Sequence, residues 1–393
     1  MRIAILTSGI LPIPAVQGGA VENLVDYYLA YNDQKKLHDI TIFSVANPKT
    51  QNHPALLSDV NHYHYIDTSS ILAKIRRFLY KLSHKKEYYN YFIEYYFEQA
   101  CKYIEQRTYD CIILENRPGY ALKLSERINS KIILHLHNDL LNNKSKCHNE
   151  VINSLCKILT VSDYIKSKVC TIQGTYKVET VHNGIDLQRF TKQSQSIINR
   201  ECLGLSKNDF ILLYSGRINK DKGVSELIDS MLLLKKTPNI KLLVLGSTFF
   251  GDVNNDDVFV KELKSKSIEI ADRITFTGFI PYAQMSNYLS ITDIAIIPSI
   301  WDDPFPTTVL EAQSMGLPII TTLRGGIPEE VSQENAILLD TDEHFIDNLA
   351  NAILDLYQHP EKRKAMSQAS LERSKLFDKN RYAKEFFGAI ETI

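Results

Sequence analysis

Residues Ser299–Thr322 read SIWDDPFPTTVLEAQSMGLPIITT, and this stretch joins two patterns that are typical of an α/β fold. A loop stiffened by two prolines leads into a short helical pattern. Gly-Leu-Pro then leads into a strand of β-branched residues. A helix placed between a loop and a buried strand is part of the repeating unit of a parallel sheet.

The same alternation of strand and helix extends along the chain in both directions. Nearly continuous apolar runs fit parallel strands that are covered on both faces. Helical spacing between them is clearest at Val21–Leu29, Tyr91–Ile104 and Val224–Leu234. The expected strands are Arg2–Thr7, Asp39–Ser44, Cys111–Leu114, Ile132–Leu136, Ile158–Val161, Phe210–Ser215, Lys241–Leu245, Ile274–Phe276, Ile294–Ile297 and Ile319–Thr321.

The pattern restarts after a polar, weakly periodic segment near residues 185–205, and the 393 residues are too many for one ordinary core. We therefore expect two doubly wound α/β domains. The formal net charge of −1 gives no global field that favours nucleic acid. Six scattered cysteines without metal-ligand spacing, and no apolar run of about 18 residues, predict a cytoplasmic protein with reduced thiols.

Ligands of open parallel sheets bind at the carboxyl ends of the strands, so the loops after the strands are the candidate sites. Gly18 and Gly19 follow the first strand and precede a helix, where a ligand can approach the backbone. Their spacing is not GxGxxG, which disfavours a nicotinamide cofactor. A plain glycine turn is the alternative interpretation.

Two histidines, His135 and His137, stand at the end of another expected strand. A neutral imidazole there can bind a sugar hydroxyl or a phosphate, and a buried structural histidine is the alternative. Their spacing also fits a metal pair, but no third ligand is evident nearby. In the loop SGRINKDKG, Arg217, Lys220 and Lys222 are suited to phosphate, although most charged runs are only solvated.

The helix of the opening stretch has two interpretations. Thr308 and Glu311 match a capping box, which is a purely structural feature. The amides of residues 307–309 also suit a diphosphate at the positive end of a helix. Glu311 is then placed to accept hydrogen bonds from a ribose diol, and Asp303 to approach a sugar.

DDPFPTTVLEAQSMGLPIIT, GGIPE, SGRINKDKG, VHNGID and GFIP with Asp293 together resemble the family 4 glycosyltransferases of the GT-B fold. Within the family, the motifs WDDPF and TTLRGGIPE are most similar to those of bacterial enzymes of surface-polysaccharide and spore-coat glycosylation. The resemblance implies two Rossmann-like domains facing across a cleft. Residues 1–187 would be the acceptor domain and 188–375 the nucleotide-sugar donor domain, with a last helix at about 376–393 packing back on the first domain.

The family implies retaining transfer of a sugar from a nucleotide donor, with a UDP-sugar favoured and a GDP-sugar as the alternative. The acceptor would be a glycan or a polyprenyl-linked oligosaccharide in bacterial surface polysaccharide synthesis, such as capsule or exopolysaccharide. No metal or other cofactor is expected, because Asp302-Asp303 is not a DxD pair.

The resemblance also assigns the site residues. Arg217 and Lys222 match the pair that holds the diphosphate, and Glu311 matches the second glutamate of E-x7-E, which binds ribose. Asp303 stands where the first glutamate is usual, and His137, with His135 as the alternative, matches a histidine near the donor sugar. The further expected donor contacts are Gly18, Gly19, Phe279, Phe305, Pro306, Thr307, Thr308 and Val309.

The segment Ile71–Lys86 reads ILAKIRRFLYKLSHKK and predicts a basic amphipathic helix. Such a helix can lie on an anionic membrane, so we expect peripheral contact with the inner membrane. The alternative is a core-packed helix with a solvated basic face. Two rival functions share this fold and remain open: a nucleotide-sugar 2-epimerase, and a non-catalytic partner subunit of a glycosyltransferase.

Overall fold

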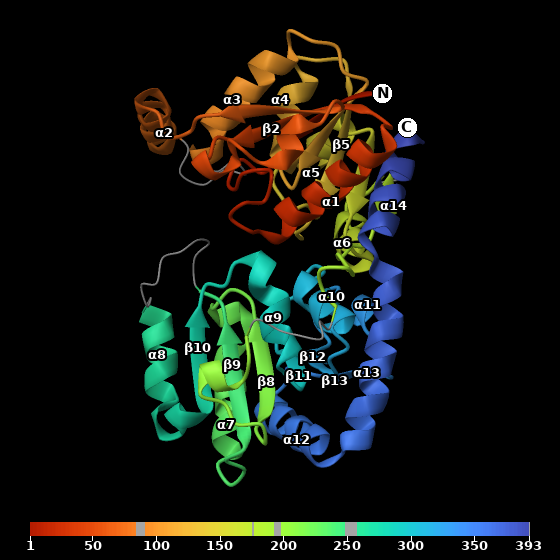
Figure 1. The fold of residues 1–393 in the computed structure, drawn as a ribbon. Coiled ribbons are helices and arrows are strands. Elements are labelled where there is room, and N and C mark those ends of the chain that lie inside the picture. The colour runs from red at the N-terminus through yellow and green to blue at the C-terminus, as the bar shows by residue number, and fades with distance from the viewer. Residues whose placement is uncertain (84–90, 175–176, 192–197, 248–257, 393) are drawn as a thin grey trace. The chain divides into compact units, whose positions relative to one another are not determined.

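The computed structural model describes residues 1–83, 91–174, 177–191, 198–247 and 258–392. The chain divides into two compact α/β units, residues 1–183 with 379–393 and residues 184–378. Each unit contains one parallel sheet flanked by helices (Figure 1). The prediction of two doubly wound α/β domains is therefore confirmed. Their division at Asn183 lies close to the predicted boundary after residue 187.

The N-terminal unit has a seven-stranded sheet in the order β3-β2-β1-β4-β5-β6-β7. The order reverses between β1 and β4, and such a reversal places a binding site at the carboxyl ends of these two strands. The strands are β1 (Arg2–Leu6), β2 (Asp39–Val45), β3 (Asn61–Ile66), β4 (Cys111–Glu115), β5 (Lys131–Leu136), β6 (Lys157–Thr160) and β7 (Val178–Thr180). The helices are α1 (Ala20–Lys35), α2 (Ile71–Ser83), α3 (Tyr91–Ile104), α4 (Pro118–Ser125), α5 (His148–Ser154), α6 (Asp163–Val169) and α14 (Lys379–Glu391).

The C-terminal unit has a six-stranded sheet in the order β10-β9-β8-β11-β12-β13, with the reversal between β8 and β11. The strands are β8 (Phe210–Ser215), β9 (Ile240–Leu245), β10 (Ile274–Gly278), β11 (Ile294–Ile297), β12 (Ile319–Thr322) and β13 (Ala336–Leu339). The helices are α7 (Val224–Leu233), α8 (Val258–Lys266), α9 (Met285–Ser290), α10 (Thr307–Ser314), α11 (Ile327–Glu330), α12 (Phe345–Gln358) and α13 (Pro360–Ser374). Side chains of α7 and α12 join those of the strands in one buried core.

The last helix, α14, belongs to the N-terminal unit because it packs on α1. The ring of Tyr28 stacks on that of Phe386, with their centroids 4.2 Å apart. Nζ of Lys157, from β6, donates hydrogen bonds to the carbonyl of Ala389 at 2.6 Å and the hydroxyl of Thr392 at 2.8 Å. The lysine thus supplies a cation to the carboxyl end of α14, where the helix dipole favours it.

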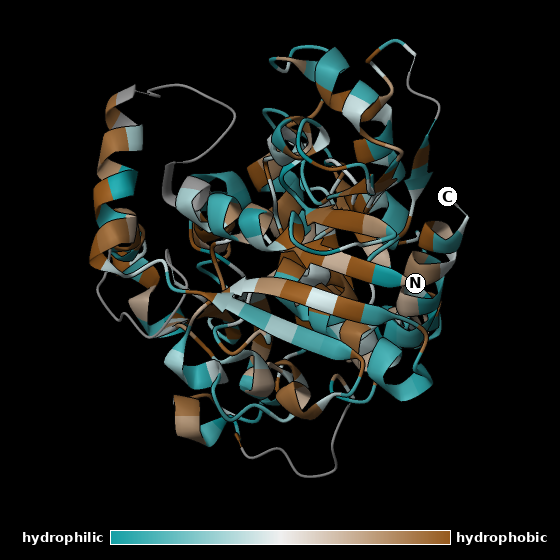
Figure 2. Ribbon diagram, turned by 90° about the horizontal axis from the view of Figure 1, so that it is seen from above, coloured by the Kyte–Doolittle hydropathy of each residue, from teal (hydrophilic) through white to brown (hydrophobic). Residues whose placement is uncertain are grey.

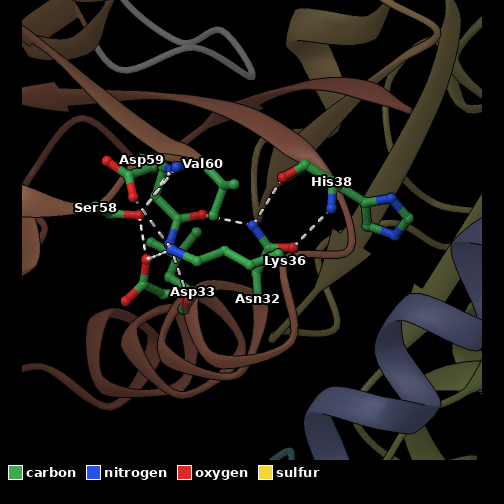
Figure 3. A network of polar contacts seen from close by, with 9 residues as sticks. Asn32, Asp33, Lys36, His38, Ser58, Asp59 and Val60 are labelled. Atoms are coloured by element: carbon green, nitrogen blue, oxygen red, sulfur yellow. Dashed lines mark hydrogen bonds and ion pairs between the residues drawn. The ribbon is translucent and has the colours of Figure 1, made fainter.

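A polar network holds the carboxyl end of α1 against the sheet (Figure 3). The buried side chain of Asn32 accepts a hydrogen bond from the His38 amide at 2.9 Å and donates one to the Asn61 side chain at 2.7 Å. Lys36, which ends the helix in the left-handed conformation, contacts Asp33 at 3.2 Å. The network therefore fixes the carboxyl end of α1 beside β2 and β3.

The apolar residues of α2 face solvent, which contradicts the alternative of a core-packed helix. Ala73 is buried, whereas the large apolar side chains are each more than half exposed. Figure 2 shows α2 lengthwise at the left, with its brown apolar residues. Lys85 and Lys86 of the predicted basic face lie outside the described residues. The exposed side chains are Ile71, Leu72, Ile75, Phe78, Leu79 and Leu82.

Candidate functional site

In the C-terminal unit, hydrogen bonds join the two loops that leave the sheet at the β8–β11 reversal. The amides of Ile300 and Trp301 donate to the carbonyl of Asp221 at 3.1 and 3.2 Å. Gly223, at φ +70°, lies so close to Pro298 that a Cβ would be 1.8 Å from the proline carbonyl oxygen. Only glycine fits this position, so the SGRINKDKG loop packs closely against the loop that follows β11.

This close approach brings Lys222 and Asp303 together as an ion pair. The Asp303 side chain is 8% exposed and the Lys222 side chain 21%, and Nζ of Lys222 lies 5.6 Å from the centroid of the Trp301 ring. The backbone oxygen of Asp303 accepts a hydrogen bond from Gly326 at 2.8 Å. Asp303 is thus a fixed counter-ion that orients Lys222 at the carboxyl edge of the sheet.

Three other predicted residues also follow strand ends in this unit. Arg217 is exposed just after β8, and its carbonyl accepts a hydrogen bond from the Tyr214 hydroxyl at 2.7 Å. Lys220 is exposed in the same loop. Phe279 is half-buried directly after β10. The structure therefore places these residues, like Lys222, in loops that follow strands of this sheet.

The capping-box prediction for α10 is wrong. The helix begins at Thr307, its N-cap is Pro306, and no side chain caps it. Thr308 is therefore the second residue of the helix, too late to act as an N-cap. The amide of Val309 donates to the Pro306 carbonyl at 3.1 Å, so it is not directed outward as predicted. The amides of the half-buried Thr307 and Thr308 remain as the candidate phosphate donors.

Glu311 is buried in the first turns of α10, with only 4% of its surface exposed. Burial raises its pKa to about 8, and a hydrogen bond from the Thr307 side chain and the charge of Arg189 oppose that shift. Glu311 is therefore mostly protonated at neutral pH. A site that binds a ribose diol through this carboxylate would first have to remove the proton.

Phe305 is a core residue of the loop ahead of α10. Its side chain is buried, and its ring contacts that of Phe377 edge-on, with the centroids 5.8 Å apart. The predicted donor contact of Phe305 therefore cannot come from an exposed ring. The phenylalanine instead anchors the loop between Asp303 and α10.

A second buried carboxyl group, that of Glu330, was not anticipated from the sequence. It is fully buried at the end of α11, and neither side-chain oxygen has a hydrogen-bond partner among the described residues. Burial raises its pKa well above the ordinary value, and Asp303 raises it further. Sequence offers little signal for it, because GGIPEE places a half-buried and a fully buried glutamate side by side.

In the N-terminal unit, Gly18 and Gly19 form the entry to α1, as predicted from their place between the first strand and a helix. Gly19 is the N-cap at φ +104°, and a Cβ there would be 2.2 Å from Oε2 of Glu22. The buried Glu22 carboxyl group contacts the Ser8 hydroxyl at 3.4 Å. Burial raises the pKa of Glu22 to about 7. The missing side chain of Gly19 therefore makes room for the carboxyl group of Glu22 as well as for any ligand.

His135 and His137 do have a third group beside them, which corrects the expectation from the sequence. Oε2 of Glu115 lies 3.0 Å from Nδ1 of His135 and 2.9 Å from Nε2 of His137. Oε1 accepts a hydrogen bond from the Tyr28 hydroxyl at 2.9 Å. The register of β4 and β5 pairs Glu115 with His135, so the glutamate could have been found as the last residue of the neighbouring strand.

The C-terminal unit also matches a known protein family. Residues 196–373 match the family model described as glycosyl transferases group 1. Spore coat protein SA of Bacillus subtilis is 27% identical over 383 residues, covering 94% of this chain and 93% of that protein. The putative glycosyltransferase YtcC of the same organism is 28% identical, with coverages of 85% and 78%.

Solved structures show the same fold over the whole chain. Alr3699/HepE of Anabaena in complex with UDP-glucose has a TM-score of 0.75 at 20% identity and covers both chains completely. Sucrose-phosphate synthase of Thermosynechococcus elongatus has a TM-score of 0.76 at 17% identity and covers 100% of this chain and 99% of its own. The predicted GT-B fold and the glycosyltransferase resemblance are thereby confirmed. Membership of family 4 and the retaining mechanism stay predictions.

Proposed function

We propose that the protein is a retaining glycosyltransferase that takes a sugar from a UDP-sugar and transfers it to a lipid-linked or glycan acceptor of a bacterial surface polysaccharide. The observation that carries the proposal is the Lys222–Asp303 pair, because it holds a half-buried cation beside the start of α10. The complexes of HepE with UDP and UDP-glucose favour UDP over GDP.

In this mechanism the protein stabilises the leaving diphosphate. Lys222 and Arg217 supply positive charge, and the first amides of α10 supply hydrogen-bond donors, as negative charge develops on the phosphates. Asp303 keeps Lys222 in place through their ion pair. The acceptor hydroxyl attacks from the face that the diphosphate leaves, and a phosphate oxygen takes its proton. No protein nucleophile and no metal ion are required for these steps.

Nucleotide release from a panel of UDP-sugars and GDP-mannose tests the proposal. Wild-type protein should release UDP, retain the anomeric configuration in the product, and be unaffected by a chelator. Arg217→Ala should slow release by about a hundredfold without changing the unfolding profile. Interconversion of the sugar without release would favour the epimerase, and no turnover by folded protein would favour the partner subunit.

The surface of α2 supports an acceptor at a membrane, where we propose that the helix lies in the interface. Its apolar stripe is exposed and is bordered by the cationic Lys74 and Arg76. An exposed apolar face edged by positive charge complements a bilayer that contains anionic lipids. Among the described residues, no helix is long and apolar enough to cross a bilayer. The exposed apolar face of α2 suits interfacial contact.

A further inference from the structure

The cluster around Glu115 lies at the carboxyl ends of β4 and β5. Glu115 and His135 are completely buried, and the His137 side chain is 6% exposed. Burial opposes ionisation of Glu115, yet its electrostatic interactions and hydrogen bonds with His135 and His137 lower its pKa well below the usual value. Burial lowers the pKa of His137 to about 4. A carboxylate therefore faces a neutral His137 ring.

The contacts of this carboxylate determine where the imidazole protons are. A carboxylate only accepts hydrogen bonds, whereas a neutral imidazole has one donor nitrogen and one acceptor nitrogen. Because Nε2 of His137 is 2.9 Å from Glu115, Nε2 must carry the proton and Nδ1 must carry the lone pair. By the same reasoning, Nδ1 of His135 is its donor.

We infer that Glu115 is a positioning residue, which fixes His137 in the Nε2–H form so that Nδ1 accepts a hydrogen bond from a hydroxyl of the donor sugar. The identity of that hydroxyl-bearing ligand rests on the proposed function. The tautomer itself does not, since it follows from contacts within the N-terminal unit. His137 consequently acts as an acceptor and cannot protonate the leaving group.

The other groups packed around Glu115 agree with this assignment. Tyr28 from α1 donates to the other carboxylate oxygen, and the carboxyl group of Glu22, also on α1, interacts with Glu115 electrostatically. The Tyr382 hydroxyl of α14 is also near enough to interact electrostatically with Glu115. A metal ion held by the three side chains is the competing explanation. If a metal ion bound Nδ1 of His135, the proton of that ring would be on Nε2. Nε2 is buried and has no hydrogen-bond partner among the described residues, so a metal would leave a buried donor unsatisfied.

Nitrogen NMR of histidine-labelled full-length protein tests the inference without any substrate. The spectra should show His137 as Nε2–H and His135 as Nδ1–H, with signals assigned through His137→Gln and His135→Gln. Glu115→Met, which keeps the length of the side chain but has no acceptor, should release His135 from the Nδ1–H form. Tyr28→Phe, the matched control, should change neither tautomer.

Calorimetry then measures how much the sugar adds to UDP binding. Glu115→Met should leave the affinity for UDP unchanged. It should reduce the ratio of the affinity for UDP-glucose to the affinity for UDP by about tenfold. Glu115→Gln should stay close to wild type, because its carbonyl oxygen can accept from both histidines while its amide group faces Tyr28.

Three results would overturn the inference: stoichiometric zinc or iron in the purified protein, His137 in the Nδ1–H form, or a Gln variant as impaired as the Met variant. If wild-type protein does not bind UDP at all, the proposed function fails, and the tautomer measurement still decides the role of Glu115.

Discussion

At the scale of single residues, Lys222 differs from the other lysine in its loop. Lys222 is half-buried and paired with Asp303, whereas Lys220 is exposed. A held cation stabilises a diphosphate more than a solvated one, because it needs no reorientation and is less screened. Lys222→Ala should reduce nucleotide release by about a hundredfold, and Lys220→Ala by less than about fivefold. Equal effects of the two variants in the release assay would contradict the role given to the ion pair.

The raised pKa of Glu311 predicts a pH dependence of nucleotide binding. If its carboxylate accepts hydrogen bonds from ribose, binding selects the deprotonated form. Because the pKa in the free protein is about 8, affinity for UDP should rise by up to about tenfold per pH unit towards pH 8 and level off above it. Calorimetry between pH 6 and 9 measures this rise. Glu311→Gln should abolish it, and an unchanged slope in that variant would exclude Glu311 as its source.

Glu330 predicts a pH dependence of stability with a defined sign. The pKa of Glu330 in the folded protein is raised above the ordinary value of 4.5. The contribution of its protonated carboxyl group to the free energy of unfolding is therefore complete below pH 4.5 and is lost as the pH rises. Glu330→Met removes two buried oxygens that lack partners, and it should stabilise the protein by about 2 kcal/mol at pH 8. Thermal unfolding at pH 5 and pH 8 measures the difference. A variant that is less stable at both values would show that the carboxyl group has a favourable role.

Residue identity predicted the charged loop but not the environment of its carboxyl groups. SGRINKDKG indicated phosphate binding because it follows a core strand, and the structure places Lys222 at that strand end. The role of Asp303 as counter-ion depends on a contact with Lys222, 81 positions earlier in the chain. The role of Glu115 depends on contacts with two histidines that follow it by 20 and 22 positions. Such contacts follow from strand order and register, which hydrophobic periodicity does not specify.

At the scale of elements, strands buried on both faces were predictable, whereas of the four edge strands that the structure describes only β10 was predicted and β3, β7 and β13 were not. β8 and β11 have the bounds expected from their apolar runs. β3, which reads NHYHYI, is a partly exposed edge strand. Its polar residues make its sequence hard to distinguish from that of a loop. The start of α10 was misread because Thr308 and Glu311 have capping-box spacing, yet Pro306 already fixes the backbone ahead of the helix.

The exposed face of α2 gives a prediction for the whole element. Replacing both Ile75 and Phe78 with serine removes two apolar side chains from the interface, each contributing at least about 1.5 kcal/mol. Flotation with vesicles that contain anionic lipid should then show membrane binding weakened by about a hundredfold. Ile268→Ser, which changes an exposed apolar residue of the C-terminal unit, is the matched control. Failure of wild-type protein to float with these vesicles would contradict the membrane role.

At the scale of the whole molecule, alternating strands and helices predicted two parallel-sheet units, because each strand run is short, apolar and followed by a helical pattern. The sequence also predicted that the loops after the strands hold the candidate site, but not the strand order that sets the two reversals. It did not show that Gly19 accommodates the carboxyl group of Glu22, or that α14 packs its aromatic side chains on α1. These features depend on the folded packing of segments that are far apart in the chain.

The central claim is that the chain binds a nucleotide-sugar through the C-terminal unit, and titration of UDP and GDP at pH 8 tests it most directly. The proposal predicts that wild-type protein binds UDP more tightly than GDP. It also predicts that folded Glu311→Ala loses most of that affinity while Lys220→Ala keeps it. Binding of neither nucleotide by folded wild-type protein would contradict the claim.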